Sequence, residues 1–133
     1  MSQPLRILVA DDEPDMRDYF KKILPRLGHL VVAAAETGRE LVEQCVALHP
    51  DLVITDILMP EKEGLETIMD LRREFPAVKI IAISGGGRTG NLNFLDIARR
   101  LGAQRILQKP FALRDMLAAV HELLQEQSGN TLS

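Results

Sequence analysis

Short apolar runs alternate along the chain with longer segments in which apolar residues recur every three or four positions. Five runs have the length of buried strands: residues 5–10, 30–34, 51–55, 79–83 and 105–108. Nearly continuous apolar sequence is typical of parallel strands that are covered on both faces. The segments between them have helical spacing, so the pattern predicts five β-strands alternating with five α-helices in an α/β fold.

The predicted helices carry start and stop signals. Pro14 suits the first turn of a helix, and residues 37–40, Thr-Gly-Arg-Glu, have the form of a capping box. Gly28 and Gly102 follow the last apolar positions of two helical segments. Since crossovers between parallel strands are right-handed, the sequence predicts a (βα)5 arrangement.

Composition places the chain among ordinary single-domain proteins. It has 133 residues, of which 46% are hydrophobic and 26% are charged, enough to build a core without metal or disulfide. Residues 1–127 are predicted to form the domain, and residues 128–133 a frayed polar tail. Cys45 lies among apolar residues at helical spacing and is predicted to be a buried thiol. The histidines are predicted to lie at the surface or at helix ends: His29, His49 and His121.

Charge and hydropathy limit the partners. The net charge of −3 argues against nucleic acid as the main partner. Because no stretch has the length and flanks of a signal peptide or membrane span, we expect a cytoplasmic protein with no membrane partner.

Polar residues follow four of the predicted strands, always at the same end. Asp11 and Asp12 follow the first strand, Asp56 the third, Ser84 the fourth and Lys109 the fifth. In an open parallel sheet, ligands bind beyond the carboxyl ends of the strands, where the strand order reverses. With strand order 2-1-3-4-5, the three carboxylates would lie side by side and repel one another strongly. Oxygen ligands with room for water suit magnesium, so the sequence predicts a Mg²⁺ site.

These groups also suit phosphoryl transfer. A divalent cation, the ammonium of Lys109 and the hydroxyl of Ser84 around one carboxylate can hold a transferring phosphoryl group. Asp56 is the predicted nucleophile, since aspartyl phosphate is an established type of covalent intermediate. The sequence therefore predicts Mg²⁺-assisted phosphorylation of Asp56.

These motifs, in this order and spacing over roughly residues 5–126, resemble the receiver domain of two-component response regulators of the chemotaxis-regulator type. The matching residues are Asp11, Asp12, Asp56, Met59, Pro60, Gly64, Ser84, Lys109, Pro110 and Phe111. The resemblance implies a flavodoxin-like, doubly wound fold with a five-stranded parallel sheet. It also implies that a histidine kinase or phosphotransfer protein donates the phosphoryl group and that an effector protein, which the sequence does not identify, receives the signal.

The resemblance assigns roles to single residues. Asp12, Asp56 and the backbone carbonyl of Leu58 would bind Mg²⁺, and Asp11 would act through a water. Ser84 and Lys109 would contact the phosphoryl group. The peptide bond before Pro110 is expected to be cis, which would aim the lysine inward.

Two positions depart from the family pattern. Ile106 stands three residues before the lysine, where the family usually has an aromatic switch residue. We therefore expect the signal to leave through the loop that begins with Gly85 and Gly86, with Ile106 filling space beneath it. Leu58 has no polar group to orient a hydrolytic water, which predicts a long-lived phosphoryl group.

The main prediction is a switch that catalyses only its own phosphorylation and dephosphorylation, and three alternatives stay open. The chain could be a receiver cut from a longer regulator with a separate output domain. It could be a Mg²⁺-dependent phosphohydrolase, although Asp56-Ile57-Leu58 lacks the second aspartate of haloacid-dehalogenase-type enzymes. It could also bind a nucleotide through its glycine-rich loop, although that loop follows the fourth strand instead of the first.

Overall fold

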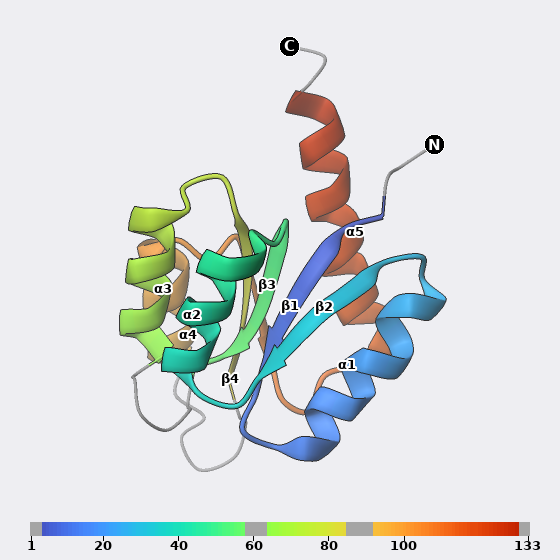
Figure 1. Ribbon diagram of the computed structural model, residues 1–133, viewed down its shortest axis with the longest axis horizontal. Coiled ribbons are helices and arrows are strands. Elements are labelled where there is room, and N and C mark those ends of the chain that lie inside the picture. The colour runs from blue at the N-terminus through green and yellow to red at the C-terminus, as the bar shows by residue number, and fades with distance from the viewer. Residues whose placement is uncertain (1–3, 58–63, 85–91, 131–133) are drawn as a thin grey trace.

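A five-stranded parallel sheet with strand order β2-β1-β3-β4-β5 forms the centre of the molecule (Figure 1). The computed structural model describes residues 4–57, 64–84 and 92–130. The strands are β1 (Arg6–Ala10), β2 (Leu30–Ala35), β3 (Leu52–Asp56), β4 (Lys79–Ser84) and β5 (Arg105–Gln108). The predicted strand order is confirmed, and each strand boundary lies within one residue of its predicted place.

Helices cover both faces of the sheet (Figure 1). The helices are α1 (Pro14–Arg26), α2 (Gly38–Leu48), α3 (Gly64–Glu74), α4 (Leu92–Leu101) and α5 (Leu113–Asn130). Ile7 and Val9 pack in the core cluster with α1 and α5, whereas Leu8 and Ala10 pack in the cluster with α2, α3 and α4. This alternation follows from the two-residue period of a strand, and it explains why both faces of β1 are apolar.

The capping box predicted at the start of α2 is present, but one of its two hydrogen bonds has a different partner. The hydroxyl of Thr37 accepts a hydrogen bond from the backbone N–H of Glu40, as in a capping box. The carboxylate of Glu40, however, accepts from the N–H of Glu36, one residue earlier than the motif predicts. Helix α5 runs to Asn130, so residues 128–130 are helical where a tail was predicted. Adding a residue to an existing helix costs far less than starting one, which lets poor helix formers continue it.

Cys45 is buried on α2, as predicted, and burial raises the pKa of its thiol to about 12. His29 lies at the end of α1, one of the two places predicted for it, and its N–H donates to the carbonyl of Leu24 at 3.1 Å, but it is not at the surface. Its side chain is buried, and Nδ1 accepts a hydrogen bond from the N–H of Leu5 at 3.0 Å. The ring lies at the turn between α1 and β2, beside the first residue of the core, so it replaces water as a backbone partner. His49 and His121 are exposed, as predicted.

A half-buried arginine, Arg72, ties α3 to the start of β5. Arg72 donates hydrogen bonds to the carbonyl oxygens of Pro76 at 2.7 Å and Gly102 at 2.8 Å, and to Oε1 of Gln104 at 3.1 Å. The same Oε1 accepts from the N–H of Ile80 at 2.7 Å. Gly102 has φ +136°, and a Cβ there would lie 2.8 Å from Nε of Arg72. The connection between α4 and β5 therefore depends on a glycine.

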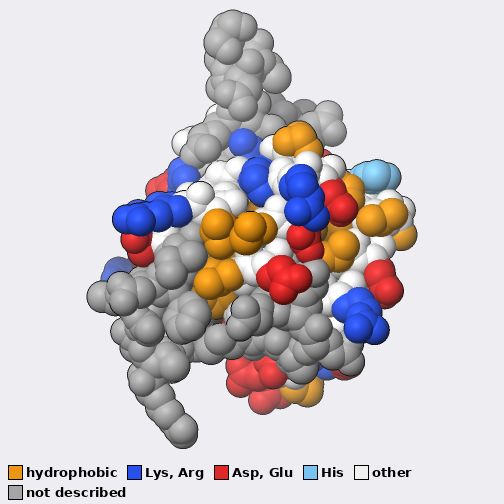
Figure 2. Space-filling view, turned by 90° about the vertical axis from the view of Figure 1, so that its left-hand side faces the viewer, with side chains coloured by type: hydrophobic (Ala, Val, Ile, Leu, Met, Phe, Trp, Pro, Cys, Tyr) orange, Lys and Arg blue, Asp and Glu red, His pale blue; other side chains and the backbone are white. Residues whose placement is uncertain are grey.

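The face over α2, α3 and α4 is mixed in character (Figure 2). Exposed hydrophobic side chains, including Met69, lie among basic and acidic ones. Ion pairs join Arg73 to Asp70 at 2.9 Å and Arg100 to Asp96 at 3.3 Å. Among the described helices, none combines the length and apolar character that a membrane crossing requires.

Candidate functional site

The candidate site lies at the carboxyl edge of the sheet, the lower edge in Figure 1. Asp11 follows β1, whereas Asp56 and Ser84 are the last residues of β3 and β4, and Lys109 follows β5. Because β3 pairs with both β1 and β4, Asp56 is placed between the acidic residues and Ser84. This is where the strand order reverses, the expected ligand site of such a sheet.

Three carboxylates meet at this edge. One carboxylate oxygen from each of Asp11, Asp12 and Asp56 lies within 4.8 Å of the others. Asp11 is 1% exposed and Asp56 is 4% exposed, whereas Asp12 faces solvent. The convergence predicted from the sequence is therefore present, with two of the three groups almost fully removed from water.

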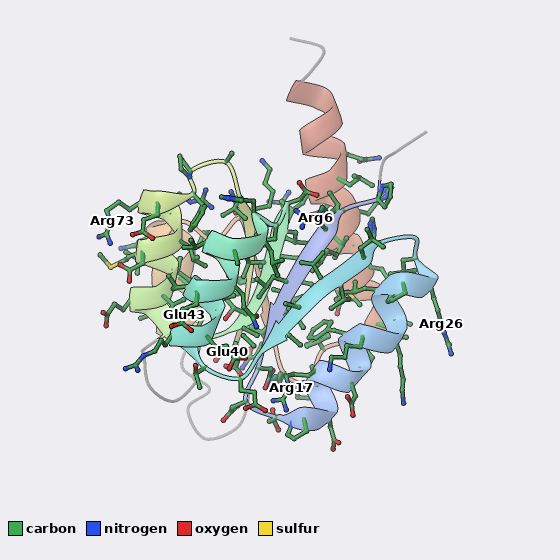
Figure 3. All side chains as sticks on the ribbon, in the orientation of Figure 1. Arg6, Arg17, Arg26, Glu40, Glu43 and Arg73 are labelled. Atoms are coloured by element: carbon green, nitrogen blue, oxygen red, sulfur yellow. The ribbon has the colours of Figure 1, made fainter. Side chains whose placement is uncertain are left out.

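Asp11 is held by several hydrogen bonds. Its N–H donates to the carbonyl of Ala35 at 3.0 Å, and its Oδ1 accepts from the N–H of Glu13 at 2.9 Å. Arg17, near the start of α1, donates to its carbonyl oxygen at 2.8 Å and to Glu36 at 3.0 Å (Figure 3). These contacts fix the position of the acidic residue on which the rest of the site is built. The sequence analysis did not identify the role of Arg17.

Lys109 is the cation of the site. Its Nζ donates to Asp11 Oδ2 at 2.8 Å, Glu13 Oε1 at 2.7 Å and Asp56 Oδ2 at 3.0 Å. Burial alone would lower the pKa of Lys109, but hydrogen bonds to the three carboxylates and the charge of Asp56 outweigh it and raise this pKa. The lysine therefore remains charged under ordinary conditions. The bond between Lys109 and Pro110 is cis, as the resemblance implied.

Glu13 is a site residue that the sequence analysis missed. No role was predicted for it, yet its side chain reaches the same ammonium as Asp11 and Asp56. A usable signal was its spacing, because Glu13 lies two residues after Asp11 in the short connection between β1 and α1.

Two further predicted residues lie close to this edge. Ser84 is buried, and its carbonyl accepts a hydrogen bond from the N–H of Lys109 at 2.7 Å. Ile106, opposite Ala82 in the sheet, is half-buried and packs against the core cluster that α2, α3 and α4 cover. Leu58, Gly85 and Gly86 lie outside the described residues, so their predicted roles remain predictions.

The residues present fit a hard divalent cation. The Lys109 ammonium contacts three carboxylates, and the carboxylate of Asp12 lies beside two of them, so negative charge is in excess around this ammonium. Carboxylate oxygens are the donors that Mg²⁺ prefers, and the exposed Asp12 leaves a side on which water ligands have room. The site could therefore hold such an ion.

A doubly wound α/β sheet with an acidic, lysine-bridged site at its switch point defines a class of protein built for phosphoryl chemistry. The sequence model described as "Response regulator receiver domain" matches residues 7–121. The chain belongs to the response regulator receiver domain family, whose members are signalling switches and not classical enzymes.

The chain matches chemotaxis proteins of the CheY type along almost their whole length. The chain is 34% identical over 118 residues to the chemotaxis protein CheY of Thermotoga maritima, covering 89% of this chain and 96% of the relative. It is 36% identical over 119 residues to CheY of Bacillus subtilis, covering 90% and 97%. The crystal structure of a CheY-like receiver domain protein from Methanospirillum hungatei has a TM-score of 0.85 at 29% identity, covering 97% of this chain and 99% of that one. The chain is thus a receiver domain homologous to CheY, consistent with a phosphorylation-dependent switch.

Proposed function

We propose that Asp56 accepts a phosphoryl group from the phosphohistidine of a histidine kinase or phosphotransfer protein, and that this changes the binding of an effector protein. The observation that carries the proposal is the position of Asp56. It ends β3, is 4% exposed, lies within 4.8 Å of two other carboxylates and contacts the Lys109 ammonium at 3.0 Å. Family membership supports the reaction type, since response regulators act with histidine kinases and effectors.

The chemistry is a transfer between two nucleophiles. A carboxylate oxygen of Asp56 forms a bond to phosphorus while the bond from phosphorus to the donor histidine nitrogen breaks. That nitrogen keeps the electron pair and takes up a proton. Asp56 serves as the nucleophile because its position on β3 fixes the direction of its side chain before the donor arrives.

The other site residues hold the transferring group. Lys109 and Ser84 would each contact a phosphoryl oxygen, replacing water with a charged donor and a hydroxyl donor. Asp11, Asp12, Asp56 and the backbone carbonyl of Leu58 form the proposed Mg²⁺ site. When bound there, the ion would neutralise charge on the phosphoryl oxygens.

Loss of the phosphoryl group completes the cycle. The chain would catalyse only its own phosphorylation and dephosphorylation, in which water attacks the phosphorus and Asp56 leaves as a carboxylate. Leu58 offers no polar side-chain group to orient that water, so we expect a long-lived phosphoryl group. The family membership disfavours the alternative of a phosphohydrolase that acts on external substrates.

The output begins at Ser84. Its hydroxyl would move towards the phosphoryl group, and its carbonyl bond to the N–H of Lys109 couples the end of β4 to that of β5. The adjoining Gly85 and Gly86 would allow rearrangement at little steric cost, and Ile106 would fill space without an aromatic rotamer change. The proposed readout surface is formed by α4, β5 and α5, and the proposed place of action is the cytoplasm.

A second candidate is a receiver that works together with an attached output domain. The observation that favours it is the length of some relatives. The transcriptional regulatory protein PdtaR of Mycobacterium tuberculosis is 33% identical over 119 residues, which span 88% of this chain but 55% of PdtaR. The chain would then be the regulatory part of a longer protein. The length of the complete gene tests this directly.

The phosphorylation site is tested by intact mass. The protein is incubated with acetyl phosphate, with Mg²⁺ or with EDTA, and we expect one phosphoryl adduct that needs the metal. Asp56→Asn should abolish the adduct. Asp70→Asn is the control, because it changes a carboxylate on α3 that pairs with Arg73 outside the site, and it should leave the adduct unchanged. An undiminished adduct in Asp56→Asn would reject the assignment.

A further inference from the structure

Glu13 directly precedes α1, and its side chain contacts Lys109. We propose that Glu13 is a positioning residue, a releasable counter-ion that holds Lys109 in the unphosphorylated chain and gives it up when the phosphoryl group is present. The proposal rests on the proposed function of Asp56 as phosphoacceptor. It adds a residue that sets how readily the site accepts that group.

The donors of Lys109 are already used. An ammonium has three N–H groups, and Nζ of Lys109 makes three hydrogen bonds to carboxylates, at 2.8, 2.7 and 3.0 Å. A phosphoryl oxygen can therefore bind this ammonium well only if one of the carboxylates gives up its bond. The question is which of the three contacts costs least to break.

Burial identifies Glu13 as the partner that leaves. Asp11 is 1% exposed and held by backbone hydrogen bonds, so losing its cation would leave a buried charge unpaired. Asp56 carries the phosphoryl group itself and stays next to the lysine. The Glu13 side chain is 61% exposed, so its carboxylate can return to water at small cost.

The backbone of Glu13 supports this role. Glu13 is the N-cap residue of α1, yet its side chain makes no cap hydrogen bond to that helix, all of whose residues the structure describes. Its carbonyl oxygen accepts from the N–H groups of Met16 at 3.1 Å and Arg17 at 3.2 Å. The helix start is therefore secured by the backbone, and the side chain can change partner without unwinding α1.

Competition for the Lys109 ammonium predicts the direction in which the affinity for a phosphoryl analogue changes. Because Glu13 competes with the phosphoryl group for one ammonium, Glu13→Gln should make the phosphorylated state easier to form. Exposed ion pairs are worth up to about 1 kcal/mol, so we expect beryllofluoride, with Mg²⁺ held constant, to bind about two- to fivefold more tightly. Binding of Mg²⁺ alone should not tighten, since the variant lowers the negative charge near the ion.

Two matched variants separate the contact from the general loss of charge. Glu13→Asp keeps the charge but is shorter by one methylene, so it should lose the contact and bind beryllofluoride as tightly as Glu13→Gln. Asp15→Asn removes an exposed acidic residue in the first turn of the same helix and should leave the affinity unchanged. The side-chain ¹³Cε resonance of Lys109 provides a direct readout and should shift in both Glu13 variants before beryllofluoride is added.

The experiment is a beryllofluoride titration followed by NMR on the full chain. No gain in affinity for Glu13→Gln, or an equal gain for Asp15→Asn, would overturn the role of Glu13 while wild-type binding leaves the phosphoacceptor site standing. Absence of binding to wild type, or undiminished binding to Asp56→Asn, would overturn both the proposed function and this inference. The inference is supported if both Glu13 variants bind beryllofluoride more tightly than wild type and Asp15→Asn does not.

Discussion

Lys109→Met should destabilise the metal-free protein strongly, because the substitution removes the only ammonium that contacts both buried carboxylates of the described site. Asp11 and Asp56, exposed by 1% and 4%, would then lie close together without the Lys109 ammonium between them. Breaking a buried ion pair by removing one partner costs about 3–5 kcal/mol. We expect about 3 kcal/mol at pH 7, because Glu13 is 61% exposed and regains water when its partner is lost. Methionine has a similar volume, so little of this loss reflects a cavity.

The pH dependence of this loss identifies its cause. Hydrogen bonds to carboxylates and the charge of Asp56 outweigh burial and raise the pKa of Lys109 in the folded state. The stability that its ammonium contributes is therefore complete below the pKa of an unfolded lysine, about 10.4, and is lost as the pH rises through the raised folded-state pKa. The deficit of Lys109→Met relative to wild type should therefore be fully present at pH 7 and shrink above about pH 10.4.

Urea denaturation in EDTA measures the effect. Lys21→Met, a change of an exposed lysine on α1, is the matched control and should change the free energy of unfolding by less than about 0.5 kcal/mol. Adding Asp56→Asn to Lys109→Met should recover much of the loss, because one of the two buried negative charges is removed. A deficit below about 1 kcal/mol at pH 7, or one that does not shrink above about pH 10.4, would refute the reasoning.

Three other changes test separate features. Asp12→Asn should raise the melting temperature in EDTA by the equivalent of about 0.5 kcal/mol and reduce the stabilisation produced by Mg²⁺, since it relieves a screened repulsion and removes a candidate ligand. Burial lowers the pKa of His29, so its contribution to stability is complete above about pH 6.5 and is lost as the pH falls through the folded-state pKa. His29→Gln should flatten the stability profile between pH 7 and 5 in urea titrations, whereas the exposed His121→Gln should not. Gly102→Ala should cost about 2 kcal/mol in urea unfolding, because φ is +136° and the added Cβ meets a neighbouring guanidinium Nε at 2.8 Å. Gly28→Ala, with φ +90° and no atom of the described residues within 4 Å of the added Cβ, should cost less, and an equal loss would assign both effects to the backbone alone.

The fold and the acidic edge could be predicted because they depend on regular patterns. Alternating apolar runs and helical spacing define the parallel sheet, and parallel strands bring their carboxyl ends to one edge. Asp11, Asp12 and Asp56 lie at the carboxyl ends of two neighbouring strands, so their meeting follows from strand order alone. The cis bond before Pro110 was accessible only through resemblance to the family, since sequence composition does not select a peptide isomer.

Contacts of single long or ring-shaped side chains could not be predicted in this way. Glu13 reaches an ammonium 96 residues away, and its choice of rotamer depends on that distant charge. Whether His29 is buried depends on a backbone N–H 24 residues earlier, which no local pattern encodes. The three carbonyl and amide acceptors of Arg72 lie in the connections before β4 and β5, so the position of its side chain likewise depends on tertiary packing.

The buried thiol of Cys45 can report how often α2 separates from the sheet. Cys45 is the single cysteine, and its pKa of about 12 in the folded state leaves almost no thiolate for alkylation. Once α2 separates from the sheet, that pKa returns towards about 8.5 and the sulfur becomes reactive. The alkylation rate then reports the population of open molecules, in the same way as amide exchange. Any metal or phosphoryl analogue that binds at the carboxyl end of β3 should slow this alkylation. The occupancy of the site can then be followed through a native side chain, without adding a reporter group.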